Sequence, residues 1–171
     1  MFYQDLQHEV NHIWEQYKDG QTYPNYEKMF KANSGFYSNN EIEKTVGRLI
    51  YYADRGEQDS FISSVYAYAR QEYPKHMENL NTILKKTDAF NAICKMKQLF
   101  SIVLKNKDRY AHYIKSTYGF KTFDMFERRI RAAIKRFEKK FAMVSRKCTD
   151  DLIIWEPNTA WFGDKENLYK L

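Results

Sequence analysis

Residues 122–147 repeat apolar side chains at spacings of three and four, and this pattern narrows the possible folds more than any other feature of the chain. Because successive residues of an α-helix are about 100° apart, this spacing gathers the apolar side chains on one face. Similar periodicity recurs along most of the chain, whereas the alternating pattern of half-buried strands is nearly absent. We therefore predict an all-α, compact single-domain bundle of about six to eight helices, followed by an irregular aromatic C-terminal tail. The stripe of the long helix consists of Phe123, Phe126, Ile130, Ala133, Ile134, Phe137, Phe141 and Val144.

Local signals divide the rest of the chain into shorter predicted helices. A helical domain is expected over residues 1–148 and an extended aromatic tail over residues 149–171. The segment 89–105 is the most apolar, so we expect it at the centre of the core. The other predicted helices cover residues 2–18, 25–32, 41–54, 60–73, 75–86 and 108–118. The predicted N-caps are Asn39 or Asn40, Asp88 and Thr122. The predicted helix ends are Gly56, Pro74 and Gly119.

Positive charge is concentrated in the long helix. From Lys121 to Lys147 there are ten Lys and Arg residues and three acids, a local charge of +7, whereas the whole chain carries +6. Compensating acids are not clustered elsewhere, and a concentrated charge of this kind usually faces an anionic partner. The pattern predicts a contact surface, with nucleic acid as the favoured ligand and with an acidic protein surface or a plain solvated face as the alternatives.

The cations of this helix lie away from its apolar stripe, and half of the ten are Arg, which suits phosphate forks. Arg146 falls on the same side, and Lys147 lies along one flank. We predict a largely electrostatic interaction whose affinity falls steeply with salt. The residues predicted to contact nucleic acid or an acidic partner are Arg128, Arg129, Arg131, Lys135, Arg136, Lys139 and Lys140.

One short stretch of this region resembles a known family. Gly119-Phe120-Lys121, together with residues 130–136, is similar to the core-binding and promoter-melting region of bacterial sigma-70-family factors. That family uses an aromatic pair for melting, which is replaced here by Arg128 and Arg129. The resemblance covers a small part of the chain, and we do not assign the chain to the family.

Two motifs have the residue spacing of known catalytic sites but lack the other features that such sites require. His8-Glu9-Val10-Asn11-His12 matches the H-E-x-x-H pattern of zinc proteases, but the expected third ligand has no counterpart. Arg70 and His76 resemble the Arg–His pair of HEPN-type ribonucleases, although Pro74 lies between them and is expected to break the helix. We therefore expect no enzymatic activity, no cofactor and no metal site.

The C-terminal tail suggests a second functional hypothesis. Trp155, Trp161 and Phe162 could anchor the tail to the core or to a partner, because Trp and Phe dominate interface hot spots. In this alternative the chain is a small adaptor or inhibitor, of the kind that phage or mobile elements encode, which binds the replication, transcription or defence machinery of a host. The stripe of residues 123–144 could also pack against a second copy, which makes a homodimer an open alternative.

Composition restricts the cellular setting. No apolar run is long enough for a membrane span, and the first residues lack the features of a secretory signal. The two cysteines, Cys94 and Cys148, fit a reducing compartment better than a disulfide framework, and Cys94 is expected in the core. We predict a cytoplasmic protein with no membrane contact.

Overall fold

The computed structural model describes residue 10, residues 34–76 and residues 79–153, with the backbone alone for residues 74–76 and 153. The described chain is entirely helical apart from its turns, which confirms the predicted all-α class. The predicted helices over 25–32 and, except for Val10, over 2–18 lie outside the described residues. The elements are α3 (Glu41–Ala53), α4 (Arg55–His76), α5 (Leu80–Lys85), α6 (Asp88–Lys105), α7 (Lys107–Tyr118), α8 (Phe123–Cys148) and the π-helical turn η1 (Thr149–Ile153).

Several helix ends lie where the local signals place them. The Asn40 side chain caps α3 by accepting hydrogen bonds from the backbone N–H groups of Ile42 and Glu43. Thr122 caps α8 in the same way through Met125, at 3.2 Å. Gly119 ends α7 with a φ of 67°, a left-handed conformation that favours glycine.

Three other predicted boundaries are wrong. Gly56 does not end a helix: α3 stops at Ala53, and α4 begins at Arg55, because the Asp54 carboxylate caps the new helix through the N–H groups of Gly56 and Glu57. Helix α4 also continues through Pro74 to His76, so the proline does not end the helix where the sequence predicted. The N-cap of α6 is Thr87, one residue before the predicted Asp88.

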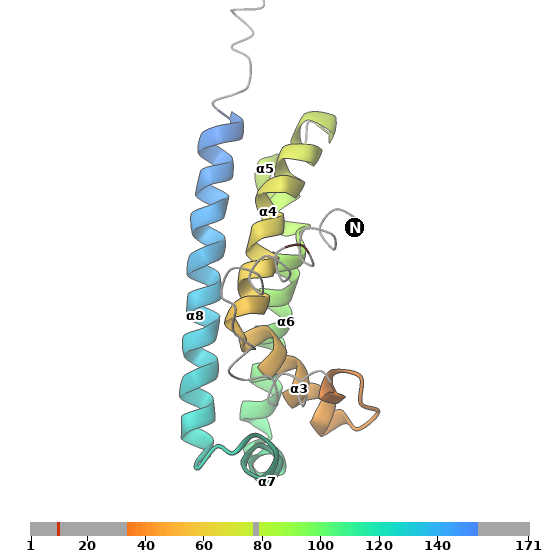
Figure 1. Ribbon diagram of the computed structural model, residues 1–171, viewed down its shortest axis with the longest axis vertical. Coiled ribbons are helices and arrows are strands. Elements are labelled where there is room, and N and C mark those ends of the chain that lie inside the picture. Colours follow the sequence, from red (N-terminus) through yellow and green to blue (C-terminus); the bar gives the residue numbers. More distant parts are fainter. Residues whose placement is uncertain (1–9, 11–33, 77–78, 154–171) are drawn as a thin grey trace, which may run out of the picture.

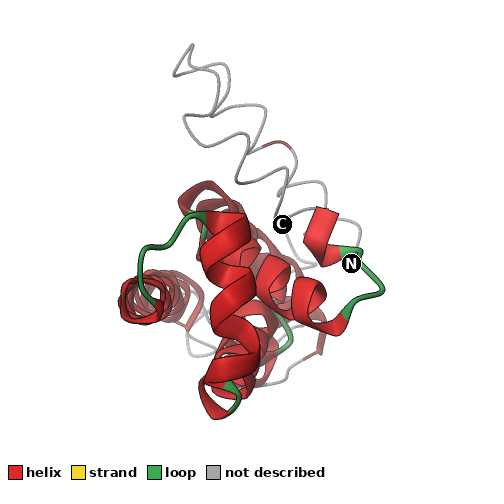
Figure 2. Ribbon diagram, turned by 90° about the horizontal axis from the view of Figure 1, so that it is seen from below, coloured by secondary structure: helices red, strands yellow, loops and turns green. Residues whose placement is uncertain are grey.

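Helix α6 forms the centre of the core, as predicted. It contacts each of the other five described α-helices, and Figure 2, which looks up the bundle from below, shows the helices gathered closely together. Its buried side chains include Ile93, Met96, Phe100 and Val103. The prediction that Cys94 lies in the core is wrong, because this residue is exposed. It lies on the opposite face of α6 from the buried Met96, and this position outweighs the usual preference of cysteine for burial.

Helix α8 runs along one side of the molecule, beside the layer that α4 and α6 form, while α7 lies crosswise at the lower end (Figure 1). Its apolar stripe packs inside the chain, with Phe126, Ile130 and Phe137 fully buried. The stripe therefore packs within the chain, which is one of the two arrangements that the sequence left open. Within the described ranges, no helix combines the length and the apolar character that crossing a membrane requires.

Candidate nucleic-acid interface

Helix α8 carries nine cations and three acids, and their contacts divide the cations into distinct groups. One group faces α4, a second lies on the side of α6 and α7, and a third points away from the protein. The division follows from helical geometry, because side chains one residue apart differ in direction by about 100°. It decides which of the charges are available to a ligand.

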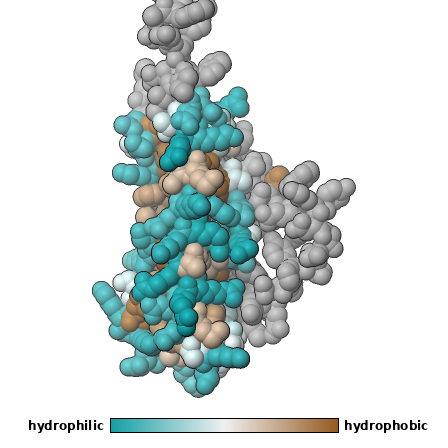
Figure 3. Space-filling view, turned by 90° about the vertical axis from the view of Figure 1, so that its left-hand side faces the viewer, coloured by the Kyte–Doolittle hydropathy of each residue, from teal (hydrophilic) through white to brown (hydrophobic). Residues whose placement is uncertain are grey.

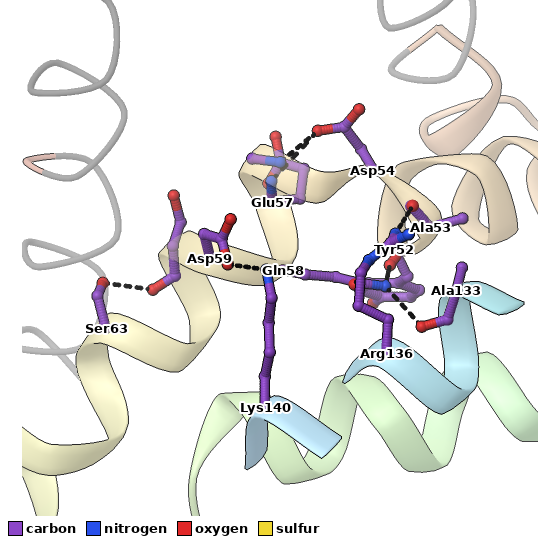
Figure 4. Close-up of polar contacts among 12 residues, drawn as sticks. Tyr52, Ala53, Asp54, Glu57, Gln58, Asp59, Ser63, Ala133, Arg136 and Lys140 are labelled. Atoms are coloured by element: carbon purple, nitrogen blue, oxygen red, sulfur yellow. Dashed lines mark hydrogen bonds and ion pairs between the residues drawn. The ribbon is translucent and has the colours of Figure 1, made fainter. Parts of the chain in front are cut away.

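Arg136 belongs to the group that faces α4, and it contributes to a buried polar cluster (Figure 4). Its Nε donates to Gln58 Oε1 and its Nη2 to the carbonyl of Ala53, both at 2.9 Å. Gln58 is fully buried, and its amide donates to the carbonyls of Tyr52 and Ala133 at 2.9 and 3.2 Å. Arg136 thus provides a positive charge at the C-terminal end of α3, whose own last turn has no basic residue.

The environment of Arg136 differs from that of a ligand-binding arginine. Burial lowers the pKa of its guanidinium, and the nearby charge of Arg55 lowers it further. Its Nε and Nη2 donate to acceptors of the protein itself. The side chain therefore connects α8 to the junction of α3 and α4, and its contribution to a phosphate contact would require breaking this cluster.

Three further cations on this side contact protein groups. Lys140 forms an ion pair with Asp59 of α4, drawn in Figure 4. Lys147 lies over the ring of Tyr66, 5.1 Å from its centroid, and Arg129 lies over Phe120 at 5.8 Å. These contacts hold α8 against its neighbours along most of its length.

On the other side of α8, each of the three acids of the helix has a cationic partner. Asp124 pairs with Lys107 at 3.4 Å and Glu138 with Lys97 at 2.9 Å. The hydrogen bond to Glu138 raises the pKa of Lys97. Glu127 accepts two hydrogen bonds from Arg131, from Nη2 at 2.7 Å and from Nε at 2.9 Å, while the Arg131 guanidinium also lies over Phe100. Every acid of α8 is thus engaged by a cation outside the third group.

The third group, which we call the outward row, consists of Arg128, Lys135, Lys139 and Arg146. All four are exposed, and helical geometry places them within an arc of about 40° over a length of about 27 Å. Among the described residues, Lys135, Lys139 and Arg146 have no side-chain hydrogen bond or ion pair, and Arg128 donates only through Nε, at 3.4 Å, to the backbone of its own helix. Figure 3 looks onto this side of the molecule, which is mostly hydrophilic with isolated hydrophobic patches.

The seven cations predicted to contact a ligand are therefore not equivalent. Arg128, Lys135 and Lys139 belong to the outward row, Arg131 and Arg129 are exposed but contact Glu127 and Phe120, and Arg136 and Lys140 face α4. Arg146 completes the row although it was outside the predicted set. Its spacing of about five helical turns from Arg128 is the signal that could have identified it.

Of the other candidate motifs, only the Arg70–His76 pair lies within the described residues. Arg70 and His76 lie in one unbroken helix, α4. His8, Glu9 and His12, like Trp155, Trp161 and Phe162, lie outside the described residues. The described part of the chain contains no group of three or more His, Cys, Asp or Glu residues that could hold a metal ion.

No family model matches the chain, and no curated protein or solved structure is significantly similar to it.

Proposed function

We propose that this chain is a non-enzymatic nucleic-acid-binding protein, or a subunit of a nucleic-acid-processing complex, which contacts phosphates through the outward row of α8. One observation carries the proposal: all three acids of α8 are paired with cations outside the row, so the four outward charges stay uncompensated. A row of cations without interspersed acids is typical of a surface that meets a polyanion.

Other anionic partners fit this surface less well. A helix that lies on a membrane presents its apolar face to the lipid, whereas the apolar face of α8 is buried in the core. Protein interfaces are usually centred on aromatic anchors, and no exposed aromatic residue occurs on α8. The adaptor or inhibitor hypothesis therefore depends on Trp155, Trp161 and Phe162, which lie outside the described residues.

The proposed mechanism is the release of counterions from the phosphate backbone. Each phosphate that a protein neutralises contributes about −0.9 to the slope of log K against log salt on duplex DNA. Four contacts predict a slope of about −3.6, which corresponds to a loss of roughly 150-fold in affinity between 50 and 200 mM salt. The binding would be strongest at low ionic strength. The cytoplasmic location is a separate prediction, made from the sequence.

Fluorescence anisotropy of a labelled duplex at several salt concentrations tests the proposal. The row variant replaces Arg128, Lys135, Lys139 and Arg146 by Gln. The matched control replaces four exposed lysines on other helices by Gln, namely Lys44, Lys85, Lys105 and Lys115. Both variants lose the same net charge, so the comparison separates the local row from the overall charge of the protein.

We expect micromolar binding at about 50 mM salt for the native chain and for the control, and a slope close to zero for the row variant. Equal losses of duplex affinity in both variants would mean that net charge, and not the outward row, is responsible for binding. If the native chain does not bind at low salt, the proposal is wrong, and a pull-down with and without residues 149–171 would then test the adaptor alternative.

A further inference from the structure

We infer that the ligand of the outward row is double-stranded nucleic acid, recognised through its phosphates without base preference, rather than a single strand. This inference rests on the proposed function and specifies its ligand. Three features of α8 support it: the rigidity of the row, the direction of the aromatic side chains, and the kinds of residue exposed beside the cations.

The outward row is a rigid array. Helix α8 has 26 residues without proline or glycine, and its inner face is held by the buried side chains of Phe126, Ile130 and Phe137. The steps of seven, four and seven residues place the four charges about 10.5, 6 and 10.5 Å apart along the axis. A duplex presents its phosphates at fixed positions, whereas a flexible strand would have to be ordered to match such an array.

The aromatic side chains of α8 are directed inward. Phe126 packs against Phe120 with ring centroids 5.4 Å apart, Phe137 against Phe61 at 6.1 Å, and Phe141 against Phe90 at 5.8 Å. Proteins that bind single strands combine a basic groove with aromatic rings on which bases stack. The described face of α8 offers no exposed aromatic ring, and the helix lies along the outer side of the bundle (Figure 1).

The residues exposed beside the cations also argue against base recognition. The exposed uncharged residues of α8 are Met125, Ala132, Ala142 and Met143. None of them has a side chain that hydrogen-bonds to a base edge, so the cations of the row, which can contact guanine, would be the source of any such contact. Contact with phosphates alone positions a protein without selecting a sequence.

The dimensions of a duplex also suit the exposed side of α8. The major groove of B-form DNA is about 12 Å wide, and an α-helix with its side chains is about 10–12 Å across. A row about 27 Å long covers about eight base pairs at 3.4 Å per pair. The exposed side of α8 can therefore approach a duplex closely while the inner side stays in the core.

Competition anisotropy with the full chain tests the inference. The probes are a DNA duplex of about 16 base pairs, twice the length of the row, a second duplex of scrambled sequence, and each separated strand with its sequence chosen to stay unpaired. We expect the two duplexes to compete equally, within about twofold, and the single strands to compete at least about tenfold more weakly, with a shallower salt slope near −2.8 for four contacts. For the row variant, duplex and single strand should compete with the same affinity.

Each result has a defined meaning. A single strand that competes as well as the duplex, or better, would overturn the inference while leaving the proposed function intact. Strong preference for one of the two duplexes would overturn the part of the inference that excludes base recognition. The absence of binding to every probe would instead contradict the proposed function itself.

Discussion

Two adjacent residues of α8, Lys135 and Arg136, have the same charge and different environments. Lys135 is exposed in the outward row, whereas Arg136 donates to Gln58 and to the Ala53 carbonyl across the interface with α3 and α4. A buried donor or acceptor that loses its partner costs more than the hydrogen bond itself contributes, because the orphaned group has lost its water as well. Arg136 therefore has a structural role, whereas Lys135 is the one of the two that the proposed interface would use.

Single substitutions at these two positions should have opposite effects. We expect Arg136→Ala to lower the free energy of unfolding by about 1–3 kcal/mol, because Gln58 loses a partner, and to change duplex affinity little. Lys135→Ala should leave stability within about 0.5 kcal/mol of the native value and weaken duplex binding. Urea denaturation and anisotropy measure the two effects on the same samples. Equal stability of the two variants would show that the cluster around Gln58 contributes nothing.

Cys148, at the end of α8, should make stability depend on alkaline pH. Burial raises the pKa of its thiol from 9.0 to about 11, so the folded protein keeps the proton at pH values where the unfolded chain has lost it. This contribution to stability is complete below pH 9 and is lost as pH rises toward about 11. We expect Cys148→Ala to reduce the decline in unfolding free energy over that range, by up to about 1.4 kcal/mol per pH unit.

The second cysteine provides the control for this measurement. Cys94→Ala removes the other thiol of the chain, which is exposed, and serves as the matched variant. If both variants follow the native profile, the thiol of Cys148 titrates in the folded protein as it does in the unfolded chain, and the burial argument fails.

At the scale of the elements, α3 lies against the backbone around Gly35 at one of its own glycines, Gly47. A Cβ atom placed on Gly47 would lie 2.8 Å from the backbone of Gly35, a distance that real side chains do not adopt. The obstacle is backbone rather than the end of a flexible side chain, so one of the two segments would have to move.

We therefore expect Gly47→Ala to destabilise the protein by about 1–3 kcal/mol, although alanine favours a helix interior over glycine by about 1 kcal/mol. Thermal denaturation monitored by circular dichroism measures the effect. Lys44→Ala, at an exposed position of the same helix, serves as the control and should be nearly neutral. An increase in stability for Gly47→Ala would mean that the close contact with Gly35 does not constrain α3.

The predictability of these elements from sequence depends on how local their signals are. Asn40, Thr122 and Gly119 act on backbone groups within a few residues, and their roles were predicted correctly. Gly56 was misread because glycine is tolerated both after a helix and in a first turn, and the Asp54 cap decides between the two. The role of Arg136 depends on Gln58, 78 positions away, so no local pattern could have separated it from Lys135.

At the scale of the whole molecule, folding redistributes charge that the sequence presents as one cluster. The concentration of cations in residues 121–147 is visible in the sequence, but two of the three acids of α8 are neutralised from other helices: Glu138 by Lys97 of α6 and Asp124 by Lys107 of α7. These contacts leave the outward row exposed on one side of the bundle. The overall charge of +6 thus understates the local field that a ligand would meet.

A row of like charges that has no acid within it should not stabilise the fold. We expect the row variant, with Gln at positions 128, 135, 139 and 146, to unfold at the same urea concentration as the native chain or at a higher one, since mutual repulsion is removed. Urea denaturation at low ionic strength, where repulsion is least screened, is the measurement. A clear loss of stability would mean that these four side chains stabilise the fold through contacts within the protein and are not available to a ligand.

Mapping the bound surface by NMR tests the central claim most directly, because it requires no substitution. Amide and arginine Nε resonances of the labelled chain would be followed while an unlabelled DNA duplex is added at low salt. We predict the largest shifts at Arg128, Lys135, Lys139 and Arg146, with the Nε resonance of Arg136 unchanged because it stays bonded to Gln58. Shifts centred on another helix, with the outward row of α8 unaffected, would contradict the account.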